Sequence, residues 1–260
     1  MKRISVIMGI YNCASTLQEA LDSLYAQTYK DFKIILCDDG SEDNTLRIAE
    51  ENASLHDNVV VIKNSMNKGL NYTLNHCLEY VDTEYVARMD GDDISLPTRF
   101  EKQIAFLDSH PEYAVVSAPM IYFDESGDFK KGKAKKYPDK YDFVKGTPFC
   151  HAPCMLRTDV MKSVGGYTDN ARILRVEDYH LWFKVYAAGY KGANLQEALY
   201  KMRDDRNAYR RRTFKSRLNE AYVKSIGYRM LHLPFYYQVY ALRPILISLL
   251  PRKIYMLLHK

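Results

Sequence analysis

Apolar runs of strand length alternate with helix-like segments through the first 120 residues, and this alternation restricts the fold more than any other feature of the sequence. Residues 4–10, 32–37, 58–62 and 85–89 are the runs that we expect to form strands. Each is apolar along nearly its whole length, which is typical of strands in parallel sheets whose two faces are both covered. The sequence therefore predicts an α/β fold with a mostly parallel sheet.

Two local signals mark where helices begin between these strands. Residues 15–18 (STLQ) have the pattern of a capping box and predict a helix that continues to about residue 25. Pro97 suits the first turn of a helix that ends near residue 109.

The pattern changes after residue 113. Residues 113–118 and 120–123 are strand-like, whereas residues 157–164 and 176–188 are helix-like. A loop rich in lysine is expected after the second of these strands, and its basic residues are Lys130, Lys131, Lys133, Lys135 and Lys136.

Polar clusters follow the four predicted strands of the first 120 residues. They lie at residues 11–12, 38–41, 67–69 and 90–93. In open parallel sheets, ligands bind beyond the carboxyl ends of the strands. We therefore expect the four clusters to converge on one cleft.

The composition is that of a globular protein, with 260 residues of which 47% are hydrophobic and 27% are charged. Five scattered cysteines without repeated spacing favour a reducing compartment over a disulfide framework. The first residues lack the pattern of a signal peptide, and no apolar run approaches the ~20 residues that span a bilayer. These features predict a cytoplasmic protein.

Charge is divided unevenly along the chain. Residues 201–260 carry 14 basic and 3 acidic side chains, a balance of +11, whereas residues 1–200 carry 23 and 29, a balance of −6. The basic segment, with its apolar residues between 242 and 258, has the character of a surface-lying anchor on an anionic membrane. The alternative is a set of helices that pack on the rest of the protein and leave a solvated basic face. A nucleic-acid partner is not expected, because no recognition module accompanies the charge.

Asp90-Gly91-Asp92-Asp93 is the strongest signal of chemistry in the chain. Three carboxylates beside a glycine at a strand end cannot all ionise without a cation or heavy solvation. Oxygen ligands select hard divalent ions such as Mg²⁺ or Mn²⁺, which are usually shared with phosphates of a substrate. The alternative is an acidic, solvated turn at the start of a helix.

Four motifs in this order and spacing resemble the family-2 glycosyltransferases of the GT-A fold. They are residues 5–12 (SVIMGIYN), 38–41 (DDGS), 67–69 (NKG) and the Asp-x-Asp of residues 90–92. The resemblance continues through residues 164–167 and 177–179 and covers about 200 residues. It implies a catalytic domain of residues 1–205, with a nucleotide-binding half (1–120) and an acceptor half (121–205), followed by a basic helical segment (206–260).

The resemblance also implies which residues bind the nucleotide-sugar donor. Asp39 would accept N–H groups of the nucleobase, Asp90 would lie by the ribose, and Asp92 would bind the metal that bridges the diphosphate. Asp-Asp-Gly-Ser is also a good turn sequence, so Asp38 has a structural interpretation. The full set of expected donor residues is Ile10, Tyr11, Asn12, Asp39, Asn67, Lys68, Asp90 and Gly91, with Asp92 and Asp90 as metal ligands.

Glu177 and Asp178 are the expected catalytic pair. By resemblance, Asp178 is the general base that deprotonates the acceptor hydroxyl, as inversion at the anomeric carbon requires, and Glu177 supports it. Carboxylates are also favoured at a helix start by the helix dipole, which is the structural alternative. His151 and Trp182 are weaker candidates for the acceptor side, and a core position is the other interpretation of Trp182.

The predicted function is therefore a metal-dependent, inverting hexosyltransferase that moves one sugar from a UDP-linked donor to a glycan or lipid-linked acceptor. Its expected setting is surface-polysaccharide assembly at the inner face of the cell membrane, where it would be peripheral. No Gln-x-x-Arg-Trp sequence follows Trp182, so the processive-synthase pattern is missing. Two alternatives remain at this point: a nucleotidyltransferase that makes nucleotide sugars, and a non-catalytic partner subunit.

Overall fold

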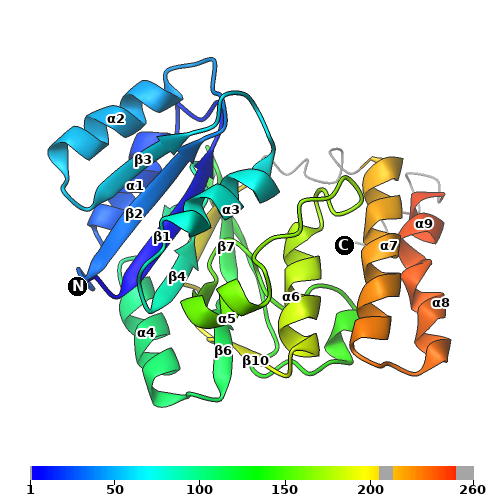
Figure 1. Cartoon of the computed structure of the whole chain (residues 1–260). Coiled ribbons are helices and arrows are strands. Elements are labelled where there is room, and N and C mark those ends of the chain that lie inside the picture. The colour runs from blue at the N-terminus through cyan, green and yellow to red at the C-terminus, as the bar shows by residue number, and fades with distance from the viewer. Residues whose placement is uncertain (1, 205–212, 250–260) are drawn as a thin grey trace.

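The computed structural model describes residues 2–204 and 213–249 and contains a seven-stranded sheet and a four-stranded sheet (Figure 1). The strands are β1 (Ile4–Ile10), β2 (Phe32–Asp38), β3 (Val59–Lys63), β4 (Tyr85–Arg88), β5 (Ile94–Ser95), β6 (Tyr113–Ser117), β7 (Met120–Asp124), β8 (Gly127–Lys131), β9 (Met155–Arg157), β10 (Lys191–Asn194) and β11 (Tyr200–Arg203). The helices are α1 (Leu17–Tyr25), α2 (Thr45–Leu55), α3 (Leu70–Glu79), α4 (Arg99–Ser109), the short η1 (Asp142–Val144), α5 (Thr158–Ser163), α6 (Glu177–Ala187), α7 (Phe214–Met230), the short η3 (Phe235–Tyr237), α8 (Gln238–Ala241) and α9 (Arg243–Ser248).

The large sheet has the strand order β10-β6-β9-β4-β1-β2-β3. Its neighbouring strands are parallel, except that β9 runs antiparallel between β4 and β6. The predicted α/β fold with a mostly parallel sheet is confirmed.

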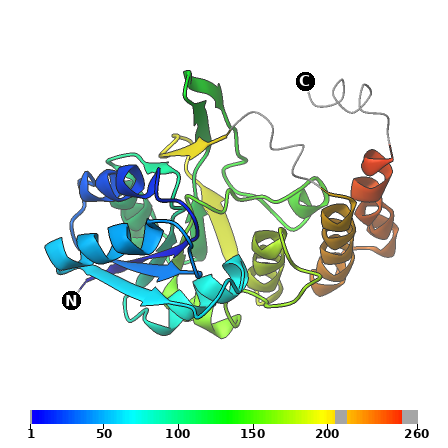
Figure 2. The same ribbon diagram turned by 90° about the horizontal axis from the view of Figure 1, so that it is seen from above.

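Helices cover both faces of the large sheet, and the side chains of β1 alternate between two cores (Figures 1 and 2). Val6 packs in one core with Leu21 of α1 and Phe100 of α4. Ile7 packs in the other core with Leu74 of α3. Full burial of an apolar side chain of this size stabilises a fold by about 1.5–3 kcal/mol, so both helix layers hold the strand ends in fixed positions.

The four-stranded sheet has the order β5-β11-β7-β8 and links the acidic turn after β4 to distant parts of the chain. Strand β5 follows that turn and pairs with β11, which also pairs with β7. Hairpin β7–β8 projects from the rest of the molecule (green in Figure 2).

The helix expected over residues 157–164 is confirmed as α5, with Arg157 and Val164 as its N-cap and C-cap and strand β9 before it. Two other sequence-based predictions of local structure were wrong. Strand β8 lies within the expected lysine-rich loop, because an edge strand can expose its lysines while its backbone pairs with β7. The capping box of residues 15–18 does not form, because Thr16 and not Ser15 is the N-cap of α1. The Thr16 hydroxyl donates to the carbonyl oxygens of Cys13 (3.2 Å) and Gly91 (3.0 Å).

The C-terminal helices pack against α6 and against one another (Figure 1). The side-chain amide of Asn219 in α7 donates to the carbonyl oxygen of Leu174 (3.1 Å). The hydroxyl of Tyr228 lies 3.5 Å from the carbonyl oxygen of Val144. None of the helices within residues 2–204 and 213–249 is long and apolar enough to cross a membrane. The expected domain boundary near residue 205, and residues 250–260 of the expected anchor, lie outside the described residues.

Gly227 of α7 provides a test of how tightly α7 is docked. A Cβ atom at Gly227 would lie 2.3 Å from Cδ2 of the buried Phe183 of α6. Overpacking of this kind costs about 1–3 kcal/mol, more than the ~1 kcal/mol that alanine gains over glycine in a helix. We expect Gly227→Ala to lower the melting temperature by about 2–4 °C for each kcal/mol lost, as measured by calorimetry. Gly146→Ala, where a Cβ meets no atom within 4 Å, is the control, and equal melting temperatures in the two variants would contradict this packing.

Candidate active site

The loops that follow β1, β2 and β4 are joined by hydrogen bonds from their own backbones. Asn12 N donates to the Ser41 hydroxyl (3.1 Å), and Glu42 N donates to the Asn12 side-chain oxygen (2.9 Å). The Thr16 bond to Gly91 ties the loop after β1 to the acidic turn. These bonds thus join three of the four polar clusters, as the parallel order of the strands predicts, but residues 38–41 and 67–69 do not line the cavities described below.

Asp39, at the end of β2, holds the turn that follows β3. Its Oδ1 accepts hydrogen bonds from Lys68 N and from the Asn64 amide, and its Oδ2 accepts one from Gly69 N, all at 2.8 Å. The side chain is buried. Because each carboxylate oxygen has two lone pairs, Oδ2 retains one for a further donor. Asn67 and Lys68 are exposed at this turn and do not line the cavities described below.

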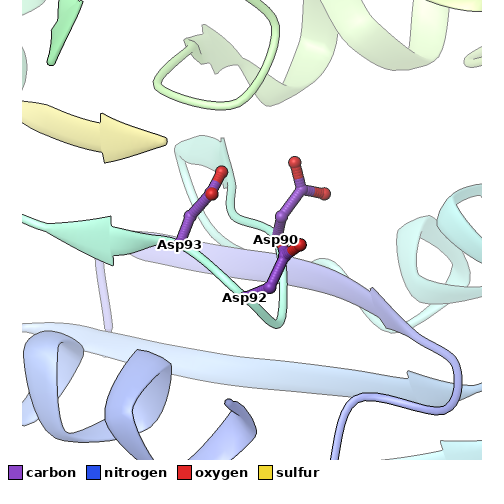
Figure 3. Close-up of side chains that lie close together, drawn as sticks. All are labelled: Asp90, Asp92 and Asp93. Carbon is purple, nitrogen blue, oxygen red and sulfur yellow. The ribbon is translucent and has the colours of Figure 1, made fainter. Parts of the chain in front are cut away.

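Asp90, Asp92 and Asp93 project their carboxylates to the same side of the turn between β4 and β5 (Figure 3). One oxygen of each lies within 4.8 Å of the others. Asp90 forms an ion pair with the buried Arg88, and Asp93 Oδ1 accepts a hydrogen bond from Arg203 N (2.8 Å).

Crowding of negative charge perturbs two of these carboxyl groups. Burial, together with Asp90 and Asp92, raises the pKa of Asp93 to about 8. Partial desolvation and the neighbouring Asp90 also raise the pKa of Asp92. A cation would relieve this repulsion, and a set of carboxylate oxygens fits Mg²⁺ or Mn²⁺. Asp92 and Asp90 are the ligands that fit, because Asp93 is buried and already bonded to the backbone of β11.

A cavity of about 370 Å³ lies between the acidic turn and the loop after β1. Tyr11, Asn12, Asp90, Gly91 and Asp92 are among the residues that line it. A Cβ at Gly91 would lie 2.8 Å from Cys13 Sγ, so only glycine allows the two loops to approach this closely. The side chain of Ile10 is buried, and its carbonyl oxygen accepts a hydrogen bond from Asp39 N (2.9 Å).

A second cavity, of about 860 Å³, is lined by Glu177 and Asp178 at the start of α6 and shares Asp90 with the first. Burial, with Glu177 beside it, raises the pKa of Asp178 to about 7. Arg175 lies two residues before Glu177 and has φ +66°, a left-handed conformation that is uncommon for a residue other than glycine. Strain of this kind is often found at functional sites.

The expected acceptor role of Trp182 is wrong. Trp182 has no exposed surface and packs edge-on against Phe149, with 5.4 Å between ring centroids, so it cannot stack on a sugar. His151 is also not among the residues that line the large cavity. Its Nε2 forms a hydrogen bond with the Tyr167 hydroxyl (2.7 Å), and burial lowers the pKa of the imidazole well below its usual value. The acceptor role expected for His151 stays a prediction.

Three residues of the site were missed by the sequence analysis. Arg88 lies buried beneath Asp90, Tyr200 accepts a hydrogen bond from Asp90 N (3.2 Å), and Arg203 donates to the carbonyl oxygen of Asp92 (3.0 Å). A charged residue inside an otherwise apolar strand was the available signal for Arg88. The other two are about 110 residues from the acidic turn in sequence, and no local pattern connects them to it.

Residues 5–165 match the model of the family described as "Glycosyl transferase family 2". The chain belongs to this family. EpsE of Bacillus subtilis is 42% identical over 259 residues, which cover 99% of this chain and 93% of EpsE. The Escherichia coli β-1,3-glucosyltransferase WfaP is 28% identical over 245 residues, 92% of this chain and 94% of WfaP, and its name gives UDP-Glc and α-D-GlcNAc-diphosphoundecaprenol as its substrates.

The fold is also that of a solved glycosyltransferase structure. The 1–349 fragment of S. aureus TarS in complex with UDP superposes with a TM-score of 0.72 at 19% identity, over 94% of this chain and 69% of that one. This likeness and the family match establish the GT-A fold. The family match also assigns the chain to the glycosyltransferases and not to the nucleotidyltransferases considered above.

The acidic turn generates a prediction about metal binding. Asp92→Asn removes a charged ligand while keeping the size of the side chain. Loss of a residue that only hydrogen-bonds to a metal ligand weakens metal binding about 10–100-fold. We therefore expect the loss of a ligand itself to abolish the Mn²⁺-dependent part of UDP binding. Calorimetric titration of UDP with and without Mn²⁺ measures this. Asp57→Asn, at an exposed aspartate in the turn before β3, is the control, and unchanged Mn²⁺ dependence in Asp92→Asn would move the metal site elsewhere.

Proposed function

We propose that this glycosyltransferase moves a single sugar, with inversion, from a UDP-sugar to a lipid-linked glycan acceptor in surface-polysaccharide assembly. The observation that carries the proposal is that Asp90 lines both cavities. The acidic turn lines the smaller cavity, which suits a nucleotide diphosphate. Asp178 lines the larger cavity, which suits an acceptor. A sugar bound at Asp90 would lie between them. The UDP bound to TarS and the substrates in the name of WfaP support this choice of donor and acceptor.

Asp178 is the proposed general base. It would take the proton of the acceptor hydroxyl as that oxygen forms a bond to the anomeric carbon. The bond from this carbon to the diphosphate would break, and the nucleoside diphosphate would leave with the electron pair. A pKa of about 7 suits this role, because a base works best when its pKa lies near the operating pH.

Residues of the smaller cavity, together with Asp39 after β2, would bind the donor. Asp92 and Asp90 would hold Mn²⁺ or Mg²⁺, which when bound neutralises charge that develops on the leaving diphosphate. Asp39 would accept an N–H of the nucleobase at its free lone pair. Its bonds to Lys68 N and Gly69 N fix its orientation before the nucleotide arrives.

The C-terminal helices would hold the enzyme at an anionic membrane surface, where a lipid-linked acceptor is found. Large apolar side chains are exposed along η3, α8 and α9, and at α9 they form one stripe. Phe235 is 88% exposed and Leu249 is 69% exposed, which is unusual for side chains of this size. The exposed set is Phe235, Tyr236, Val239, Tyr240, Leu242, Leu246 and Leu249.

The role of Asp178 predicts both a kinetic defect and a pH dependence. Asp178→Asn should lower kcat by roughly 10²–10⁴-fold, the usual effect of removing a general base. UDP affinity should remain that of the wild type, since Asp178 lines only the larger cavity. In the wild type, kcat/KM should rise with pH through about 7, because the carboxyl group must lose its proton to act as a base. Steady-state kinetics across this range decide the point, and near-wild-type turnover in the variant would place the base elsewhere.

The exposed apolar stripe predicts membrane binding. Burial of a large apolar side chain contributes about 1.5–3 kcal/mol, so Phe235→Ser combined with Leu246→Ser should reduce binding to phosphatidylglycerol vesicles more than tenfold. Co-sedimentation measures this, with Leu55→Ser, 76% exposed on α2, as the control. Raising the salt concentration should weaken the binding of the wild type without abolishing it, since salt screens the electrostatic attraction to the lipid but not the burial of apolar side chains. Equal sedimentation of the double variant and the control would refute the membrane surface.

A further inference from the structure

The large cavity has an acidic end and a basic part. Asp90, Glu177 and Asp178 form the acidic end. The basic part is built by residues from the C-terminal helices and from the loops that face them, and these are Lys145, Arg175, Arg217, Lys224 and Arg243. The mechanism proposed above uses none of these five residues.

Lys224 of α7 is the most informative of the five, because its side chain is buried and lines the cavity. Lys224 is 2% exposed, and burial lowers the pKa of its ammonium group. Its ion pair within the described residues joins Nζ to Glu220 Oε1 at 3.8 Å, beyond hydrogen-bond range. Glu220 also pairs with Arg217 at 3.2 Å, so one carboxylate faces two cations. A buried cation with this little compensation is costly unless a ligand supplies negative charge.

Arg175 and Arg243 are two further cations that reach the cavity. For Arg175 and Arg243 no ion pair exists within residues 2–204 and 213–249. Arg175 has its left-handed conformation two residues before Glu177. Arg243 begins α9 and lines the same cavity as Lys224. The cavity thus gathers positive charge from three separate elements.

We propose that this basic part of the cavity binds the diphosphate of the acceptor, so that the substrate is a glycosyl diphosphate attached to a lipid. Lys224, Arg243 and Arg175 would contact the phosphate oxygens. The acceptor sugar would then extend toward Asp178, which lies in the same cavity. The inference rests on the proposed function and adds to it the group by which the acceptor is recognised.

The size and the lining of the cavity agree with a substrate of this class. Its volume of about 860 Å³ is at the upper end of the usual range for ligand sites, enough for a sugar together with a diphosphate. Pro244 and Ile247 of α9 give it an apolar wall beside Arg243. A lipid attached to the diphosphate could leave along this wall, because α9 also bears the exposed Leu246.

Two matched probes test the proposal on the full chain with UDP and excess Mn²⁺ present. One is N-acetylglucosamine joined through a diphosphate to a short alkyl chain, and the other is the same alkyl glycoside without the diphosphate. Because hydrogen bonds to charged groups are strong, we expect the first probe to bind about tenfold or more tightly than the second in calorimetric titrations. Lys224→Met and Arg243→Gln should each remove most of this difference. Lys215→Met, at an exposed lysine of α7 outside the cavity, should preserve it.

The outcomes separate this proposal from the proposed function. If UDP with Mn²⁺ does not bind to the wild type, the donor side of the proposed function fails. If UDP binds but the two probes bind equally, or if both variants retain the wild-type difference, the diphosphate site is refuted. Inorganic pyrophosphate is the third probe: tighter binding than the alkyl diphosphate, or displacement by UDP, would show a site for a soluble anion and would also refute it. Melting temperatures of both variants exclude loss of folding as the cause.

Discussion

The ion pair between Arg88 and Asp90 is the interaction on which the arrangement of the site depends. Arg88 is buried at the end of β4, and the fully buried Arg99 of α4 donates to its carbonyl oxygen (2.7 Å). Burial lowers the pKa of Arg99 to about 10, with Arg88 acting in the same direction, so positive charge accumulates beneath the acidic turn. Breaking a buried ion pair by removing one partner costs about 3–5 kcal/mol, which makes Asp90 structurally as well as chemically important.

This charge arrangement explains how one turn can serve two cavities. The carboxylate of Asp90 pairs with Arg88, and its backbone N–H donates to the hydroxyl of Tyr200. The position of Asp90 therefore does not depend on a ligand. Strand β11, which provides Tyr200, also holds Asp93 through the backbone of Arg203. The acidic turn is therefore fixed by a strand that lies about 110 residues further along the chain. In the proposed function, a donor and an acceptor would meet at a carboxylate that both segments position.

The sequence alone predicted those parts of the site that are contiguous. Residues 38–41 and 90–93 follow strands, and parallel strand order is enough to bring them together. It could not predict Tyr200 and Arg203, because their contact with Asp90 and Asp92 depends on how β11 pairs with β5. Two strands of the large sheet, β9 and β10, were not predicted, because runs of three and four residues are too short for a periodic signal. Trp182 was wrongly given a second, ligand-binding role, because an aromatic residue on a helix beside a catalytic residue can face either the core or the cavity.

Helix α9 has one face on the larger cavity and another on the outer surface of the protein. Arg243 and Ile247 are four residues apart and line the cavity, whereas Leu242, Leu246 and Leu249 follow the i, i+4, i+7 pattern and are exposed. Two faces of one short helix thus have different partners. If the exposed face lies on a bilayer, the cavity opens within one helix diameter, about 10 Å, of the lipid surface. An acceptor diphosphate at the head-group level could then reach Lys224 and Arg243 while its lipid stays in the membrane.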